Sequence, residues 1–202
     1  LEFRRVLFRS LTTSQLASFS TDAIVSLTTA QVASLTTTQI QSLASEQVAV
    51  LETRDLVALA TDRIRTLTTS QLGGMTTQQF AALTSDQLAA LSTAQLQSVE
   101  SRDVAALSTA SLAGLSTAQV VALTSEQVYS LATQQVAALT TLQVVSLETT
   151  DLAGLSANQV RALQTQQVAA LSTAQLPSLS ADWSGYLTTQ QVAAIENATL
   201  AK

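Results

Sequence analysis

The 202-residue chain contains no cysteine and no histidine. Without cysteine it can form neither a disulfide framework nor a thiolate metal site. It also has no glycine-rich phosphate loop, and no activating base stands beside its many Ser and Thr hydroxyls. The sequence therefore predicts a protein that is not an enzyme and that has no catalytic residues and no cofactor.

Charged and aromatic residues are scarce, at 11% and 3% of the chain, and the net charge is −5. A chain so poor in Lys and Arg lacks the basic surface that nucleic acid requires. No apolar run approaches the 18 or so residues that predict a membrane-spanning helix. Yet 47% of the residues are hydrophobic, mostly Leu, Val and Ala. The chain is therefore expected to bury a core rather than to stay disordered.

The sequence from Leu11 to Lys202 divides into 24 consecutive octads without insertion or deletion. Position 1 of each octad is apolar, position 3 is usually Ser or Thr, position 5 is usually Gln, and position 6 is apolar in all but one octad. A fixed period of this kind predicts a repeat architecture. The predicted domains are accordingly a leader over residues 1–10 and one octapeptide-repeat solenoid over residues 11–202.

Each octad has the signals of a helix start. In the octad that begins at Leu27, Thr28 can cap the helix, Gln31 can complete a capping box, and Leu27 and Val32 can form a hydrophobic staple. Because hydroxyls are more regular at position 3, the cap can alternatively lie at Thr29. Both assignments predict a helix of five or six residues, and glycine at position 8, as at Gly114 and Gly154, suits a left-handed helix stop.

Two other architectures fit the octad less well. An ideal helix drifts by about 80° per octad, so the apolar residues of one long helix would wander around its axis, and a coiled coil is excluded. A β-solenoid is the open alternative, although positions 1 and 6 would then face opposite sides of a strand and few residues favour turns. Helices this short do not form alone. We therefore expect an all-α solenoid or superhelix of very short capped helices, each stabilised by neighbouring repeats of the same chain.

A longer period of 48 residues is superimposed on the octads. Glu occupies position 2 only at Glu52, Glu100, Glu148 and Glu196, and the first three are followed at position 5 by Asp55, Asp103 and Asp151. If a coil contains two or three octads, these acidic pairs return to one face. Paired carboxylates at a helix start are the weak candidates for calcium, against the interpretation that they are ordinary helix-start acids. We otherwise expect no metal site.

Two segments depart from the octads. LEFRRVLFRS, residues 1–10, resembles translated sequencing-adapter sequence and is interpreted as a non-native leader, with a basic membrane anchor as the alternative. The octad LSADWSGY departs at Trp183, Ser184 and Gly185, shortly after Pro177. Trp183 and Tyr186 can form an aromatic binding patch, but a local kink with rings that fill a packing gap is the favoured interpretation.

The octads LTTAQV, LSTAQL and LTSEQV resemble repeat arrays of very large proteobacterial secreted or surface proteins, often labelled haem-utilisation or adhesion proteins. The resemblance implies an extracellular or cell-surface location and a non-catalytic stalk or spacer. The alternative is an adhesin-type module that binds cell-surface carbohydrate, protein or calcium through a regular face. The haem label has no support, because no histidine is present and the lone Met75 stands at a core position.

Overall fold

The computed structural model describes residues 8–172, 175–176 and 181–200. The chain divides into two compact units, Leu1–Leu107 and Ser108–Lys202. The described part of each unit is built from helices joined by short turns and contains no strand. The all-α solenoid of short helices is confirmed, and the alternative β-solenoid is wrong.

In the first unit a helix of four to six residues occupies each octad. These helices are α2 (Thr13–Ala17), α3 (Thr21–Val25), α4 (Thr29–Ser34), α5 (Thr37–Ser42), α6 (Ser45–Ala49), α7 (Thr53–Val57), α8 (Thr61–Ile64), α9 (Thr69–Gly73), α10 (Thr77–Ala82), α11 (Ser85–Ala89), α12 (Thr93–Gln97) and α13 (Ser101–Ala105).

The second unit repeats this pattern until its last helix, which is longer. Its helices are α14 (Thr109–Ala113), α15 (Thr117–Val121), α16 (Ser125–Tyr129), α17 (Thr133–Ala138), α18 (Thr141–Ser146), α19 (Thr149–Ala153), α20 (Ala157–Ala162), α21 (Thr165–Ala169), α22 (Ala181–Tyr186) and α23 (Thr189–Leu200).

The helices begin at position 3, and position 2 is the N-cap. Thr28 has an extended backbone with φ −77° and ψ 153°, and its side chain accepts a hydrogen bond from the Gln31 amide. Gln31 Oε1 in turn accepts from the Thr28 amide at 2.7 Å, which completes the predicted capping box. Placement of the cap at Thr29 is therefore wrong, since Thr29 is the first helical residue.

The helices end without a left-handed residue. Gly114 (φ −80°, ψ −11°) and Gly154 (φ −85°, ψ −4°) are right-handed, and the described residues include none with positive φ. The predicted left-handed stop is therefore wrong. The chain leaves each helix through extended residues at positions 1 and 2, which requires no left-handed turn. Where Ser or Thr stands at position 8, its hydroxyl can donate back to the position 5 carbonyl, as Ser34 Oγ does to Gln31 at 2.7 Å.

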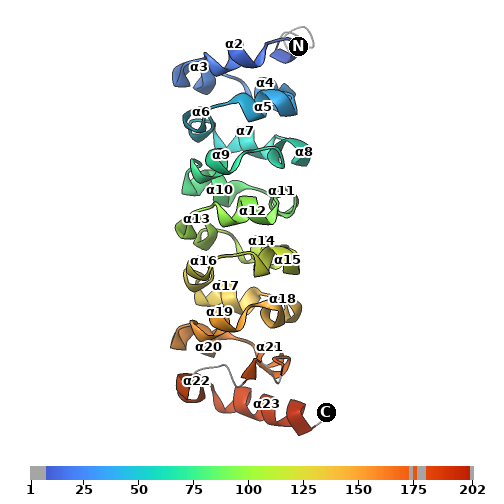
Figure 1. Ribbon diagram of the computed structural model, residues 1–202, viewed down its shortest axis with the longest axis vertical. Helices are drawn as coiled ribbons and strands as arrows, with labels where there is room; N and C mark the ends of the chain where they lie inside the picture. Colours follow the sequence, from blue (N-terminus) through green and yellow to red (C-terminus); the bar gives the residue numbers. More distant parts are fainter. Residues whose placement is uncertain (1–7, 173–174, 177–180, 201–202) are drawn as a thin grey trace. The chain divides into compact units, whose positions relative to one another are not determined.

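Three octads make one coil. In the first unit α7 packs against α4 and α10, and α10 packs against α13, so that each helix contacts the helix three places along the chain. The second unit follows the same rule, with α17 between α14 and α20. Figure 1 shows this arrangement, in which the helices of one coil lie beside those of the next within each unit. Equivalent residues of successive coils, such as Leu27 and Leu51, are thus 24 positions apart.

The core consists of positions 1 and 6. Every residue at position 1 from Leu27 to Leu171 is buried, and so is every residue at position 6 from Leu16 to Val168. Each octad therefore removes two large apolar side chains from water, which contributes about 2 kcal/mol for each side chain. Small residues at positions 7 and 8 let helices of neighbouring coils approach closely.

The last helix departs from the rule of one helix for each octad. α23 runs from Thr189 to Leu200 and passes through Ile195 and Glu196, where a break was expected. This octad has neither a Ser or Thr at position 2 nor a Gln or Asp at position 5, because Glu196 and Thr199 stand there. A continuous helix satisfies the backbone amides that would otherwise need a cap. The missing cap does not by itself prevent a break, because the octad of α8 has Ala60 and Arg63 at these positions and still begins a separate helix.

Candidate functional site

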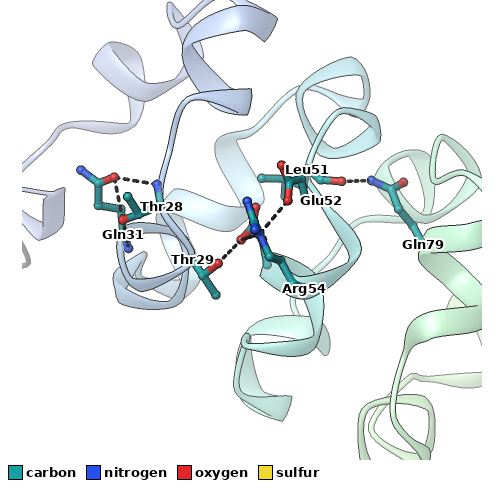
Figure 2. Close-up of polar contacts among 8 residues, drawn as sticks. Thr28, Thr29, Gln31, Leu51, Glu52, Arg54 and Gln79 are labelled. Atoms are coloured by element: carbon teal, nitrogen blue, oxygen red, sulfur yellow. Dashed lines mark hydrogen bonds and ion pairs between the residues drawn. The ribbon is translucent and has the colours of Figure 1, made fainter.

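The glutamine at position 5 joins one coil to the preceding coil. Gln79 Oε1 accepts from the Thr76 amide at 2.8 Å, while Nε2 donates to the carbonyl oxygens of Val48 at 2.9 Å and Leu51 at 2.6 Å. Figure 2 shows Gln79 reaching the Leu51 carbonyl and Gln31 turned back onto its own cap at Thr28. Gln79 is 3% exposed. One buried amide thus caps its own helix and satisfies the end of another.

This contact recurs along the chain with the same spacing. Further glutamines donate to the carbonyl oxygens 28 and 31 residues earlier; they are Gln39, Gln47, Gln71, Gln87, Gln143, Gln167 and Gln191. Their predicted role as capping-box partners is confirmed, but sequence reasoning missed this second role. A signal was present, because Gln47 and Gln135 persist where Ala44 and Ala132 have replaced the capping hydroxyl.

Arg63 takes the glutamine's place in its octad. Its Nε donates to the Leu35 carbonyl at 2.6 Å, over the same separation of 28 residues. A planar side chain with N–H donors can therefore replace glutamine in this contact. Arg63 Nη1 also lies 3.2 Å from Asp62 Oδ1, so this residue combines the contact between coils with a local ion pair.

The aspartates at position 5 make a different contact. Asp55 Oδ1 accepts from Thr29 Oγ1 at 2.6 Å, and Asp103 accepts from Thr77 at 2.5 Å. In the second unit Asp151 accepts from a serine hydroxyl, that of Ser125, at 2.7 Å. All three aspartates are at most 3% exposed. A carboxylate cannot donate to carbonyl groups, so these coils are joined through the position 3 hydroxyl of the preceding coil.

The glutamates of the acidic pairs face solvent beside an arginine. Arg54 Nε lies 2.6 Å from Glu52 Oε2 and 4.0 Å from Asp55 Oδ1. Arg102 is similarly 2.8 Å from Glu100 and 3.7 Å from Asp103. In each of these two pairs one guanidinium group lies beside two carboxylates and balances one of their two charges. These contacts are weak because Arg54 and Glu52 are 70% and 45% exposed.

The third acidic pair has no such arginine, because Thr150 stands between Glu148 and Asp151. Within the described residues no group of three or more His, Cys, Asp or Glu side chains is placed to hold a metal ion. Calcium binding at the acidic pairs stays a prediction. Within the first unit, α7 and α13 both pack on α10, so the pairs of Glu52 and Glu100 lie in one column of helices, as the three-octad coil requires.

Trp183 is a core residue. It stands at position 5, where most octads have glutamine, and it is 1% exposed. This burial agrees with the packing interpretation, and Trp183 cannot contribute an exposed ring to a patch with the half-buried Tyr186. Its Nε1 has no hydrogen-bond partner. Pro177, which was expected to accompany a kink, lies outside the described residues.

Tyr129 and Gly154 form a matched pair on successive coils of the second unit. A Cβ atom added to Gly154 would lie 2.1 Å from the Tyr129 ring carbon Cζ. The Tyr129 hydroxyl donates to the Thr150 carbonyl oxygen at 3.0 Å, although the residue is 40% exposed. Glycine thus leaves room here for the Tyr129 ring, which would have to move if residue 154 had a side chain, and its backbone angles do not call for glycine.

The segments of the chain that match a known family recur with a spacing close to the 48-residue period. Four segments match the ALTTAQ repeat, at residues 8–37, 48–85, 97–133 and 144–181, and together they span more than half of the chain. The chain belongs to the ALTTAQ repeat family. No curated protein matches the chain. The last three ALTTAQ segments begin close to 48 residues apart, in keeping with the longer period seen in the sequence.

The first ALTTAQ segment begins within the predicted leader. The Phe8 carbonyl accepts from Gln39 Nε2 at 2.8 Å, and Arg9 Nε donates to the Ser34 carbonyl at 3.3 Å. Phe8 stands where position 6 of a preceding octad would fall. The non-native origin of residues 1–10 stays a prediction, but their last residues contact the ALTTAQ array. No described helix is long and apolar enough to cross a membrane.

Proposed function

We propose that this array of ALTTAQ repeats is a non-catalytic spacer or stalk segment of a larger secreted or cell-surface protein. Membership of a repeat family makes the chain a structural repeat protein. The resemblance of its octads to arrays of large secreted and surface proteins supports the more specific role and location.

One observation carries the proposal. Two of the recurring polar positions are used inside the fold: the position 2 hydroxyl caps a helix, and the position 5 glutamine caps a helix and bonds to the preceding coil, as Thr76 and Gln79 do. The Ser or Thr at position 3 recurs as regularly but is exposed or partly exposed, as at Thr53 and Thr77. The exposed position 4 varies from octad to octad, with Ala30, Gln78 and Leu142 among its residues. The residues at positions 2 and 5 therefore join helices and coils into length, while the side chain at position 4 differs between octads.

A length series tests the spacer role. One and two extra copies of residues 51–98 would be inserted after Ser98, with fluorophores attached at exposed sites before and after the insertion. Stacked helices lie about 8 to 10 Å apart, so each inserted block of two coils should lengthen the distance between the labels by about 16 to 20 Å. A distance that fails to grow evenly with block number would refute an extended spacer.

The adhesin-type alternative is tested in the same preparations by titration with calcium and with a panel of glycans. A spacer predicts no saturable binding through the repeated face, and replacement of the exposed Glu52, Glu100 and Glu148 by Gln should change nothing. Saturable calcium binding that this triple variant abolishes would instead favour the binding module. The glutamates are preferred to the aspartates because Asp55, Asp103 and Asp151 are buried between coils.

A further inference from the structure

A hollow of about 280 Å³ lies on the first unit, where α8 packs against α11. Its polar wall is formed by Thr61, Asp62 and Arg65, and its apolar wall by Ala89 and Ala90 of the next coil. This volume is close to the lower limit of small-molecule sites, so the hollow suits a ligand of monosaccharide size.

The octad that forms the polar wall, LATDRIRT, has an arginine at position 5 and another at position 7. Arg63 is held between coils by its bond to the Leu35 carbonyl at 2.6 Å, and its side chain is 17% exposed. The same guanidinium lies 3.2 Å from Asp62 Oδ1. Arg63 therefore lies beside Asp62 as a counter-charge, while the Asp62 carboxylate stays 58% exposed at the edge of the hollow.

Arg65 has a different environment. Its residue is exposed, and its guanidinium group makes no hydrogen bond or ion pair with any residue that the structure describes. Asp86 of α11 stands one turn before Ala90. Arg65 is the one cation that lines the hollow, and Asp62, which is paired with Arg63, is the one anion. The hollow is thus a local site for an anion on an acidic protein.

We infer that this hollow binds a small hydroxylated carboxylate of the sugar-acid class. The planar fork of Arg65 can donate two parallel hydrogen bonds to a carboxylate. The free acceptor capacity of Asp62 and the Thr61 hydroxyl can bind ligand hydroxyls. Ala89 and Ala90 can contact the C–H groups of the ring. A phosphate dianion suits the site less, because a single arginine faces it and the Asp62 carboxylate lies beside it.

The inference goes beyond the proposed spacer role and does not depend on it. A solenoid can carry one ligand site on an irregular octad while its other octads serve only as length. Failure of the binding test would leave the length series unaffected, and failure of the length series would leave this site unaffected.

The test is a titration of the full chain with glucuronate, followed by NMR of the arginine Nε–Hε groups and the backbone amides. We expect saturable shifts at residues 61–65 and 89–90, and no shifts with glucose, which lacks the carboxylate. Absence of saturation with glucuronate would overturn the inference. Equal affinity for acetate would also overturn it, since Asp62 and Thr61 would then contribute nothing. Tighter binding of inorganic phosphate than of glucuronate would overturn it as well.

Arg161 offers a matched control. Like Arg65, it is an exposed arginine at position 7 of its octad. Asn158 and Gln159 stand at the positions that Asp62 and Arg63 have in the octad of Arg65. Arg65→Gln should weaken glucuronate binding at least about tenfold, since it removes a charge-assisted bidentate contact. Arg161→Gln should leave the affinity unchanged. Equal effects of the two variants, at matched thermal stability, would show non-specific attraction and refute the site.

Discussion

At the scale of single residues, the molecule depends on glutamines that bond in two directions. Gln78 and Gln79 are adjacent in α10, yet the first is exposed and the second is buried against the carbonyls of Val48 and Leu51. Identical residue types one position apart therefore have different energetic roles. The difference comes from the position within the octad and not from the side chain.

This contrast gives a direct test. Gln79→Glu replaces a donor by a carboxylate that faces two carbonyl oxygens, and it should lower the free energy of unfolding by about 2 to 3 kcal/mol. Gln78→Glu makes the same chemical change at an exposed site and should have an effect within about 0.5 kcal/mol. Urea denaturation followed by circular dichroism measures both. Equal losses would mean that the bonds between coils contribute little.

The pairing of Tyr129 with Gly154 gives a second test. Gly154→Ala places a methyl group where the Tyr129 ring lies, so the exposed ring must turn away and lose its hydrogen bond to Thr150, which should cost about 0.5 to 1.5 kcal/mol. Tyr129→Ala removes the obstacle, and in that background Gly154→Ala should be neutral or slightly stabilising, because alanine favours helix more than glycine does. Thermal denaturation of the four proteins completes a double-mutant cycle. Additive effects would show that the ring does not constrain Gly154.

At the scale of the helix, the elements from α2 to α22 are all too short to be stable alone. α8 has four residues, and its neighbours have five or six. Isolated helices become even marginally stable only at about 12 to 15 residues. Each helix therefore depends on its capping residues and on the helices three places before and after it.

A charge placed in the core should consequently disorder several octads together. Leu83 is 2% exposed between α10 and α11, and Leu83→Asp should abolish hydrogen-exchange protection in α8, α10 and α11 at once. Ser85→Asp adds the same charge at an exposed helix start and should preserve protection. Rapid exchange confined to residues 83–90 of the Leu83→Asp variant would contradict the dependence on neighbours.

Much of this element structure could be predicted from the sequence, because the capping box and the staple are local signals. Thr28, Gln31 and Val32 lie within five residues of one another, and their roles follow from their spacing alone. The contact between Gln79 and Leu51, the hydroxyl donated by Thr29 to Asp55, and the hollow beside Arg65 join residues of different coils. They could not be predicted before the number of octads in a coil was known.

The conformation of the helix ends could not be predicted from the local sequence either. Glycine after a helix usually marks a left-handed residue, and that expectation failed at Gly114 and Gly154. The tight approach of Tyr129 explains Gly154, and this approach spans one coil of sequence. A residue type that has a common local explanation can thus be explained by a distant neighbour.

At the scale of the whole molecule, the octad is the unit of register and three octads are the unit of stacking. Deletion of residues 83–90 removes one octad and leaves every later residue at an equivalent position, and deletion of residues 83–106 removes one coil. Both should change the melting temperature by only a few degrees. Deletion of residues 87–90 moves polar residues into core positions, and cooperative unfolding should be lost. Similar melting of all three proteins would show that the octad is not the structural unit.

The relation between the coil and the longer period has a consequence for how such chains change over generations. Since a coil uses three octads and the higher repeat contains six, gain or loss of one higher repeat by unequal recombination adds or removes two full turns. Every octad downstream then keeps its place in the three-octad order of its coil. Natural variants of this gene that differ by whole higher repeats can therefore differ in length while each octad keeps the same kind of neighbour in the coils before and after it.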